Sequence, residues 1–294
     1  MTDFAISGAL AAAGFDSGVR DSSPLSGGCI HAVHRVDLND GTSLVAKVAG
    51  ASQRSLLEEE ALGLESLAAT GTVAVPTSFG VFAASDQVVF LLEYLEPARA
   101  DDTAWRAFGR ALAALHQTAV GERYGFAMDN HIGATPQRNR ECDDWVEFMA
   151  RQRLGPQIEW AVGRGQLTAE EARAVERVID GLDGWLDRRV FPSLLHGDLW
   201  SGNAMGTAVD GGTTVAVIDP APSIGDGWAD HGMMRLFGGF APGAFDAYAE
   251  MIEPPDDLER RIALYQLYHV LNHVNLFGRG YAGQAVSLAR EITG

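Results

Sequence analysis

The eight residues "HGDLWSGN", 196 to 203, give the strongest indication of chemistry in this sequence. Asp198 and Asn203 are five positions apart, and sixteen residues further on Asp219 ends the apolar run "VAVID". Carboxylate and amide oxygens are suitable ligands for Mg²⁺, which often binds to one or two carboxylates together with substrate phosphates. This order and spacing are typical of a kinase catalytic loop followed by a metal-binding Asp. We also expect Pro220 to hold Asp219 in an extended conformation.

The N-terminal third contains the only lysine of the chain, Lys47, whereas the other 21 of the 22 basic residues are arginine. Lys47 lies in "SLVAKVA", which follows "CIHAVHRVDL" and the turn sequence "NDGT". This pattern predicts a β-hairpin. The segment 53–69 has helical periodicity, and we expect Glu60 on it to pair with Lys47. Glu58 and Glu59 are interpreted as solvated, because a helix turns by about 100° per residue.

The remaining pattern divides the chain into two lobes. "TSFGVF" and "DQVVFLLEYL" predict two further strands, and Pro97 with the polar residues up to Asp102 marks a boundary. We expect an α+β fold with a small β-rich N-terminal lobe, residues 1–96, and a larger helical lobe, residues 97–294. The expected helices lie near residues 103–118, 143–153, 168–188, 228–237, 256–277 and 284–292.

Composition excludes several classes of partner. The net charge of −17 argues against nucleic acid or an anionic membrane as a main partner. No apolar run reaches the ~18 residues of a membrane span, and the N-terminal segment is expected to form a short amphipathic helix rather than a signal peptide. Two cysteines, Cys29 and Cys142, cannot form a disulfide framework, which favours a cytoplasmic location.

Four segments together resemble the fructosamine kinase (ketosamine kinase) family, which belongs to the aminoglycoside phosphotransferase and protein-kinase-like superfamily. They are "LLHGDLWSGN", "VIDPA", "RLFGGF" and "YQLYHVLNHVNLFGRGY", and the resemblance runs from near Gly27 to about Tyr281. It implies a two-lobed protein-kinase-like fold, ATP and Mg²⁺ as cofactors, and phosphorylation of the sugar 3-hydroxyl of fructosamines or ribulosamines, a deglycation step. One departure is "GDGWADHGMMRLF", where His231 and Gly232 occupy positions that are usually apolar in the family.

The resemblance also implies roles for individual residues. Asp198 would orient and deprotonate the sugar hydroxyl, Asn203 and Asp219 would bind Mg²⁺, and Lys47 with Glu60 would bind the ATP phosphates. The other residues expected at ATP are Gly27, Gly28, Glu93, Tyr94 and Leu95, and those expected at the substrate are Trp200, His273 and Asn275. For Trp200, stacking on the sugar and a place in the core are both open.

Three further interpretations concern partners and regulation. About ten residues separate Asp219 from the helix near Trp228, which leaves no room for a protein-kinase activation loop and favours a small substrate over a protein side-chain hydroxyl. The resemblance implies that this substrate is a small-molecule ketoamine or a glycated amine. Asp226 and Asp230 are expected to cap that helix, with bracing of the catalytic loop as the alternative. Cys29 follows the glycines of the expected phosphate loop, so it is a candidate for redox sensitivity, with simple packing as the alternative.

Two other functions remain open at this stage. The first is a kinase of the same fold with an aminoglycoside or an amino alcohol as substrate, against which Trp200 and "NHVNLFG" argue. The second is a non-catalytic ATP-binding module. The presence of Lys47, Asp198, Asn203 and Asp219 argues against that module.

Overall fold

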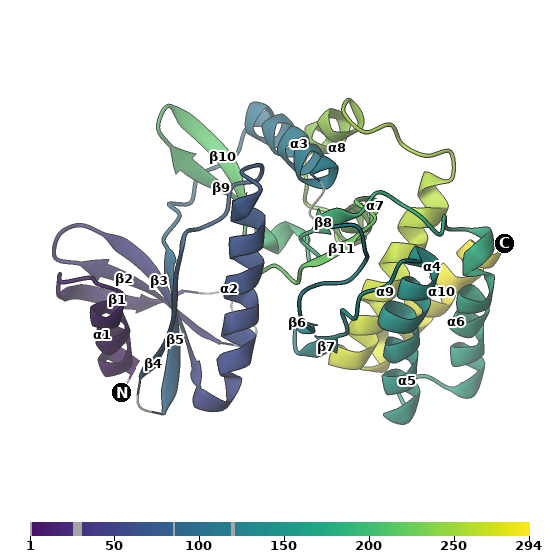
Figure 1. The fold of residues 1–294 in the computed structure, drawn as a ribbon, viewed down its shortest axis with the longest axis horizontal. Helices are drawn as coiled ribbons and strands as arrows, with labels where there is room; N and C mark the ends of the chain where they lie inside the picture. Colours follow the sequence, from purple (N-terminus) through teal and green to yellow (C-terminus); the bar gives the residue numbers. More distant parts are fainter. Residues whose placement is uncertain (1, 26–30, 85, 119–120) are drawn as a thin grey trace. The chain divides into compact units, whose positions relative to one another are not determined.

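The computed structural model describes residues 2–25, 31–84, 86–118 and 121–294. They form two compact units, one made of Met1–Ala100 with Met205–Asp219 and the other of Asp101–Ala204 with Pro220–Gly294. The first unit contains a five-stranded sheet, and the second is mainly helical (Figure 1). The expected α+β class is therefore confirmed. Within the described ranges, no helix is both long and apolar enough to cross a membrane.

The sheet of the first unit has the strand order β1-β2-β3-β5-β4, and all neighbours are antiparallel. The predicted hairpin is present and pairs Val33 on β2 with Lys47 on β3. Strand β1 was not predicted, because its sequence "VRDSSP" lacks alternating apolar residues. It lies at an edge of the sheet, where a strand is paired on one side only. The bounds are β1 (Val19–Pro24), β2 (Ala32–Leu38), β3 (Ser43–Gly50), β4 (Ser78–Ala84) and β5 (Gln87–Glu93).

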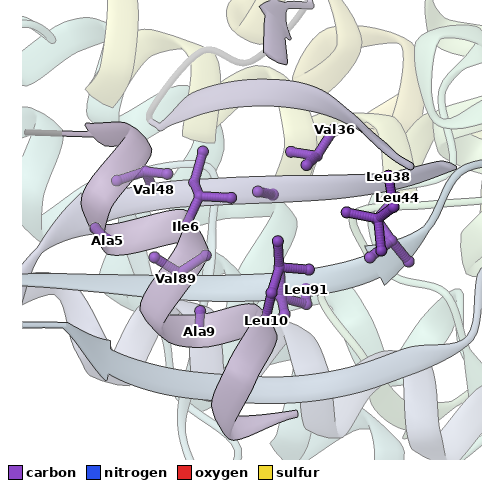
Figure 2. Packing of buried hydrophobic residues seen from close by; sticks show 11 residues of the cluster. Ala5, Ile6, Ala9, Leu10, Val36, Leu38, Leu44, Val48, Val89 and Leu91 are labelled. Carbon is purple, nitrogen blue, oxygen red and sulfur yellow. The ribbon is translucent and has the colours of Figure 1, made fainter. Parts of the chain in front are cut away.

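Two helices cover the two faces of this sheet (Figure 1). Helix α1 (Thr2–Ala12) packs Ile6 and Leu10 against one face, in a cluster with Val48 of β3 (Figure 2). Ala46 of β3 belongs to the same cluster. Helix α2 (Arg54–Ala69), which follows a short 3₁₀ turn (Ala51–Gln53), packs on the other face through Leu57, Ala61 and Leu64. Because successive side chains of a strand point to opposite faces, Lys47 is directed toward the α2 face.

The second unit is built around the long helix α9, most of whose residues are buried. Its other helices are α3 (Asp102–Gln117), α4 (Trp145–Phe148), α5 (Gly155–Gly163), α6 (Ala169–Gly181), α7 (Trp228–Leu236), α8 (Pro242–Ala249) and α10 (Ala282–Thr293), with α9 at Leu258–Phe277. Short helical turns lie at Leu182–Gly184, Ser201–Asn203 and Arg279–Tyr281. Two antiparallel strand pairs, β6 (Asn130–Ile132) with β7 (Thr135–Gln137) and β8 (Ser193–Leu195) with β11 (Ser223–Gly225), lie among the helices. A third pair, β9 (Ala204–Val209) with β10 (Gly212–Val217), belongs mainly to the first unit.

Two predicted helices differ in extent from the observed ones. The helix expected at 143–153 continues through a π-helical segment (Met149–Leu154) into α5. Pro156 does not end this helical run, because it lies in the first turn of α5, a position that tolerates the missing N–H of a proline. The helix expected at 168–188 ends as an α-helix at Gly181. A Cβ on Gly181 would lie 2.4 Å from the ring of Trp185, so the chain folds back over this glycine. Helix α8 was not predicted.

Candidate active site

A cluster of three charges surrounds the buried ammonium of Lys47 in the first unit. The Lys47 ammonium Nζ lies 2.6 Å from Glu60 Oε1, so the contact expected from the sequence is present. The same ammonium also pairs with Asp219 Oδ1. Glu58 instead pairs with Arg54 on the exposed side of α2, one turn earlier. Helical periodicity therefore identified the member of the "EEE" run that faces the sheet.

The charges of this cluster do not balance, since one ammonium faces two carboxylates. Burial alone would lower the pKa of Lys47, but Asp219 and Glu60 outweigh burial and raise it. Burial, together with the charge of Asp219, raises the pKa of Glu60 to about 7 despite the attraction of Lys47. A divalent cation bound to Asp219 would supply the missing positive charge. The donor chemistry and the charge of the cluster thus fit Mg²⁺.

Asp219 has an unusual backbone conformation. It is the only non-glycine residue with a positive φ in the described part of the chain, at 54°. The expectation that Pro220 would keep it extended was wrong. Asp is one of the residue types that tolerate the left-handed region, and the chain turns here after β10 has ended at Val217. Val217 N donates to Ala74 O at 2.8 Å, which fixes the end of that strand within the first unit.

The loop "HGDLWSGN" lies in the second unit, directly after β8. Ala221 N donates to His196 O at 2.9 Å. Gly197 has a φ of 82°, and a Cβ there would lie 1.9 Å from Ala221 O, so only glycine fits. Asn203 Nδ2 donates to the backbone O of Asp198 at 2.9 Å and lies 3.4 Å from Asp198 Oδ2. The amide of Asn203 is thereby fixed with its nitrogen toward Asp198.

The buried carboxylate of Asp230 holds the start of this loop by hydrogen bonds to its backbone. Asp230 Oδ2 accepts from His196 N and Asp230 Oδ1 from Gly197 N, each at 2.8 Å. His116 Nε2 lies 3.2 Å from Asp230 Oδ2. Burial alone would raise the pKa of Asp230, but His116 and these donors outweigh burial and lower it. The bracing alternative is therefore correct for Asp230.

Its neighbour Asp226 accepts from Trp228 N at 3.1 Å and from Tyr265 Oη at 2.6 Å. This carboxylate is thus bonded to the first residue of α7 and to α9, but the N-cap position of α7 is Gly227, so Asp226 is not the cap itself. Of the residues around the loop, His116 was missed by sequence reasoning. No local pattern connects it to Asp230, which is 114 positions away.

Trp200 is not a core residue, since 39% of it is exposed. Its ring lies over Gly202, where a Cβ would be 2.2 Å from the ring. The adjacent Ser201 contacts the turn after α7, because a Cβ on Gly239 would lie 2.5 Å from Ser201 Cβ. The ring of Trp200 is therefore an exposed aromatic surface on the loop 196–203, as the stacking interpretation requires.

The two other candidate substrate residues lie on α9. The ring of His273 is half-buried and contacts Phe237 and Tyr281, with centroid distances of 5.1 and 5.2 Å. Asn275 is buried, and its Nδ2 donates to Gln157 Oε1 at 2.7 Å and Gln157 O at 2.9 Å. The amide nitrogen of Asn275 is therefore bonded inside the helical unit.

The remaining candidate ATP residues lie in the first unit. Glu93 ends β5, and its Oε2 accepts from Thr77 N at 3.0 Å. The ring of Tyr94 is covered by the Arg35 guanidinium at 4.2 Å, and Leu95 is partly buried. Gly27, Gly28 and the redox candidate Cys29 lie outside the described residues.

Comparison with known proteins identifies the family. The model of the fructosamine kinase family matches residues 5–293. The chain belongs to this family. A relative from Synechocystis sp. named as a probable ketoamine kinase is 39% identical over 280 residues, which cover 93% of this chain and 90% of the relative. Ketosamine-3-kinase of Mus musculus is 32% identical over 94% of this chain and 96% of its own.

Solved structures support the same fold. A Thermobifida fusca protein assigned as a fructosamine-3-kinase is 33% identical with a TM-score of 0.84, and the match covers 94% of both chains. The aminoglycoside phosphotransferase APH(4)-Ia, at 17% identity, has a TM-score of 0.63 over 94% of this chain and 96% of its own. The expected protein-kinase-like phosphotransferase fold is therefore confirmed.

Proposed function

We propose that this protein is an ATP-dependent kinase that phosphorylates the sugar 3-hydroxyl of ketoamines. The observation that carries the proposal is the buried lysine of the sheet, bonded to Glu60 and Asp219, in a chain of the fructosamine kinase family. Phosphoryl transfer is catalysed mainly by positioning and charge stabilisation, and this cluster provides both. The family relatives named as ketoamine and ketosamine kinases support the choice of substrate.

The first unit is proposed to bind the nucleotide. Lys47, held by Glu60, would contact the α- and β-phosphates of ATP as a compact point charge. Gly27 and Gly28 would offer backbone N–H groups to the phosphates. The backbone of Glu93, Tyr94 and Leu95 would contact adenine, as the resemblance implies.

The second unit is proposed to act on the acceptor. Asp198 would accept the proton of the sugar 3-hydroxyl as the hydroxyl oxygen attacks the γ-phosphorus, while the bond from this phosphorus to the β,γ-bridging oxygen breaks and ADP leaves with that oxygen. Asn203, together with Asp219 of the first unit, is proposed as a ligand of Mg²⁺, which when bound would neutralise phosphate charge and orient the γ-phosphoryl group. The exposed ring of Trp200 would stack on the sugar. His273 and Asn275 are also proposed as substrate residues. Asn275 would act indirectly, because its amide nitrogen is bonded to Gln157 inside the helical unit.

The test is the turnover of Mg·ATP by the purified protein with a panel of ribulosamines, fructosamines, aminoglycosides and amino alcohols. We expect ADP formation with ketoamines only, and phosphorus NMR of the product should show phosphate on the 3-oxygen. Chelation of Mg²⁺ with EDTA should abolish turnover, and added Mg²⁺ should restore it. Turnover of an aminoglycoside or an amino alcohol without turnover of any ketoamine would contradict the proposal.

A further inference from the structure

A line of buried side chains connects α9 to the segment 221–222. Tyr268 Oη donates to Gln137 Oε1 at 2.7 Å. Gln137 Nε2 donates to Asn130 Oδ1 at 2.9 Å and to Ala221 O at 3.1 Å. Asn130 Nδ2 donates to Pro222 O at 2.9 Å. All of these groups belong to the second unit, and all three side chains are buried.

The backbone of Ala221, just after Asp219, contacts the loop 196–203 through both its N–H and its carbonyl oxygen. Its N–H donates to His196 O, and its carbonyl oxygen packs against Gly197 so closely that no Cβ would fit between them. Gly197 precedes Asp198 in the sequence, and Ala221 follows Asp219 by two residues. The Ala221 peptide therefore sets the position of the loop that carries Asp198, and Gln137 donates to this same peptide.

A buried arginine fixes the direction of the amides. Arg153 is 4% exposed, and among the described residues no carboxylate forms an ion pair with it. Its Nη2 donates to Asn139 Oδ1 at 2.8 Å, and its Nη1 donates to the backbone oxygens of Arg138 and Gln152. Since Arg153 can only donate, the oxygen of the Asn139 amide must face it. Asn139 Nδ2 then faces Asn130 Oδ1 at 2.9 Å.

The orientations of the Asn130 and Gln137 amides follow from their other hydrogen-bond partners. Because Asn130 Oδ1 accepts from Asn139 and from Gln137, its Nδ2 faces Pro222 O. At the other end, the hydroxyl of Tyr268 donates to Gln137 Oε1, so Gln137 Nε2 faces Ala221 O. Buried amides that are fully hydrogen-bonded in a single pattern have one stable orientation, since a reversed amide would leave donors facing donors.

We propose that Gln137 is a positioning residue of this kinase, which holds the Ala221 carbonyl and thereby the loop that carries Asp198. The inference rests on the proposed phosphoryl transfer, in which Asp198 meets the acceptor hydroxyl. The amides of Asn130 and Asn139, with Arg153, act on the same segment by keeping Gln137 and Pro222 in place. Gln137 acts through backbone groups, so no contact with substrate is required of it.

The first test is Gln137→Met, which keeps the length of the side chain and removes its hydrogen bonds. We expect kcat to fall about 100-fold, the loss associated with a displacement of reacting groups by roughly 1 Å. The KM for ATP should change by less than about 3-fold, because the variant alters acceptor positioning rather than nucleotide binding. Hydrogen–deuterium exchange of peptides covering residues 194–204 should become faster, since their backbone position depends on Ala221.

Two further variants make the test specific. Gln137→Glu replaces the Nε2 donor by an oxygen, so its kcat relative to wild type should recover as the pH is lowered, because the protonated carboxyl group regains an O–H donor. Tyr124→Phe removes the 2.8 Å hydrogen bonds between Tyr124 Oη and the backbone of Val190 in the same unit. It should leave kcat and the exchange of residues 194–204 as in wild type.

Wild-type kcat and wild-type exchange in Gln137→Met would overturn the inference. Equal losses of kcat in Gln137→Met and Tyr124→Phe would also overturn it, because the effect would then be a general loss of stability. If wild-type protein phosphorylates no ketoamine, the proposed function fails. The exchange of residues 194–204 still decides the role of Gln137 in that case, since it needs no substrate.

Discussion

Replacement of His231 by leucine should remove about 2 kcal/mol of the acid sensitivity of the fold. His231 is 1% exposed, and its ring centroid lies 4.8 Å from that of Trp228 and 4.1 Å from that of Tyr248. In the described part of the chain neither ring nitrogen has a hydrogen-bond partner. Burial, with smaller effects of His116 and Arg235, lowers the pKa of His231 to about 3. The imidazole is therefore buried as a neutral ring.

The magnitude follows from proton linkage. The unfolded chain binds a proton at this histidine below pH ~6.5, whereas the folded chain does so only near pH 3. Between these values the unfolded state binds more protons, so lowering the pH destabilises the folded state. Each pH unit in this window costs about 1.4 kcal/mol, which gives about 2 kcal/mol at pH 5 for this single group.

The assay is urea unfolding of wild type and His231→Leu at pH 8 and pH 5. The wild type should lose about 2 kcal/mol more than the variant between these two conditions, since leucine has no proton to bind. Other titrating groups, including the buried His269, are present in both proteins and cancel in the comparison. Met233→Leu, a change at a neighbouring buried residue, should show the same pH dependence as wild type. Parallel losses in wild type and His231→Leu would show that this ring is not buried neutral, and would refute the reasoning.

Three other changes give equally direct tests. Asp198→Asn should lower kcat by about 10²–10⁴-fold with little change in ATP affinity, because Asp198 is proposed to act on the acceptor. Steady-state kinetics and nucleotide titration measure the two effects, and near-normal turnover would remove Asp198 from the mechanism. Lys47→Arg should have a severely reduced kcat/KM despite its unchanged charge. A planar guanidinium between Glu60 and Asp219 cannot place a point charge on the phosphates as the ammonium would. A wild-type kcat/KM would show that any cation serves at this position. Gly232→Ala should lower the free energy of unfolding, measured by urea denaturation, by about 1–3 kcal/mol. The added Cβ would lie 2.7 Å from Tyr265 Cβ, at the contact of α7 with α9. An unchanged free energy of unfolding would mean that these helices separate easily.

Short-range patterns predicted the parts of the site that depend on one or two neighbouring elements. The alternation of "SLVAKVA" placed Lys47 on one face of a strand, and the periodicity of residues 53–69 placed Glu60 on the inner side of the next helix. These two rules were sufficient because the strand and helix are consecutive and pack directly against each other.

Interactions between distant segments could not be predicted in this way. Gln137 meets Ala221, and His116 meets Asp230, only because the second unit brings separate loops and helices together. The conformation of Asp219 was predicted wrongly for a related reason. The preference of a residue before proline is a local rule, and here the turn that the chain must make after β10 outweighs it.

The departure at His231 and Gly232 also has a packing explanation rather than a chemical one. His231 fills an apolar position as a neutral aromatic ring, and Gly232 lets α7 approach Tyr265. The contacts named here are made with residues of α7, α8 and α9. A sequence pattern identifies such positions as unusual, but the partners that explain them lie on other helices.

The single lysine has a consequence for the chemical durability of the protein itself. Ketoamines arise when a reducing sugar condenses with an unprotonated amine, and in most proteins exposed lysines are the main targets. This sequence offers one ε-amino group, which is 8% exposed and kept protonated by Glu60 and Asp219. Its surface cations are guanidinium groups, which sugars do not convert to ketoamines. Lys47 is therefore shielded from the modification whose products the protein is proposed to process, and reaction of Lys47 itself with an amine-directed reagent would report on the opening of the charged cluster.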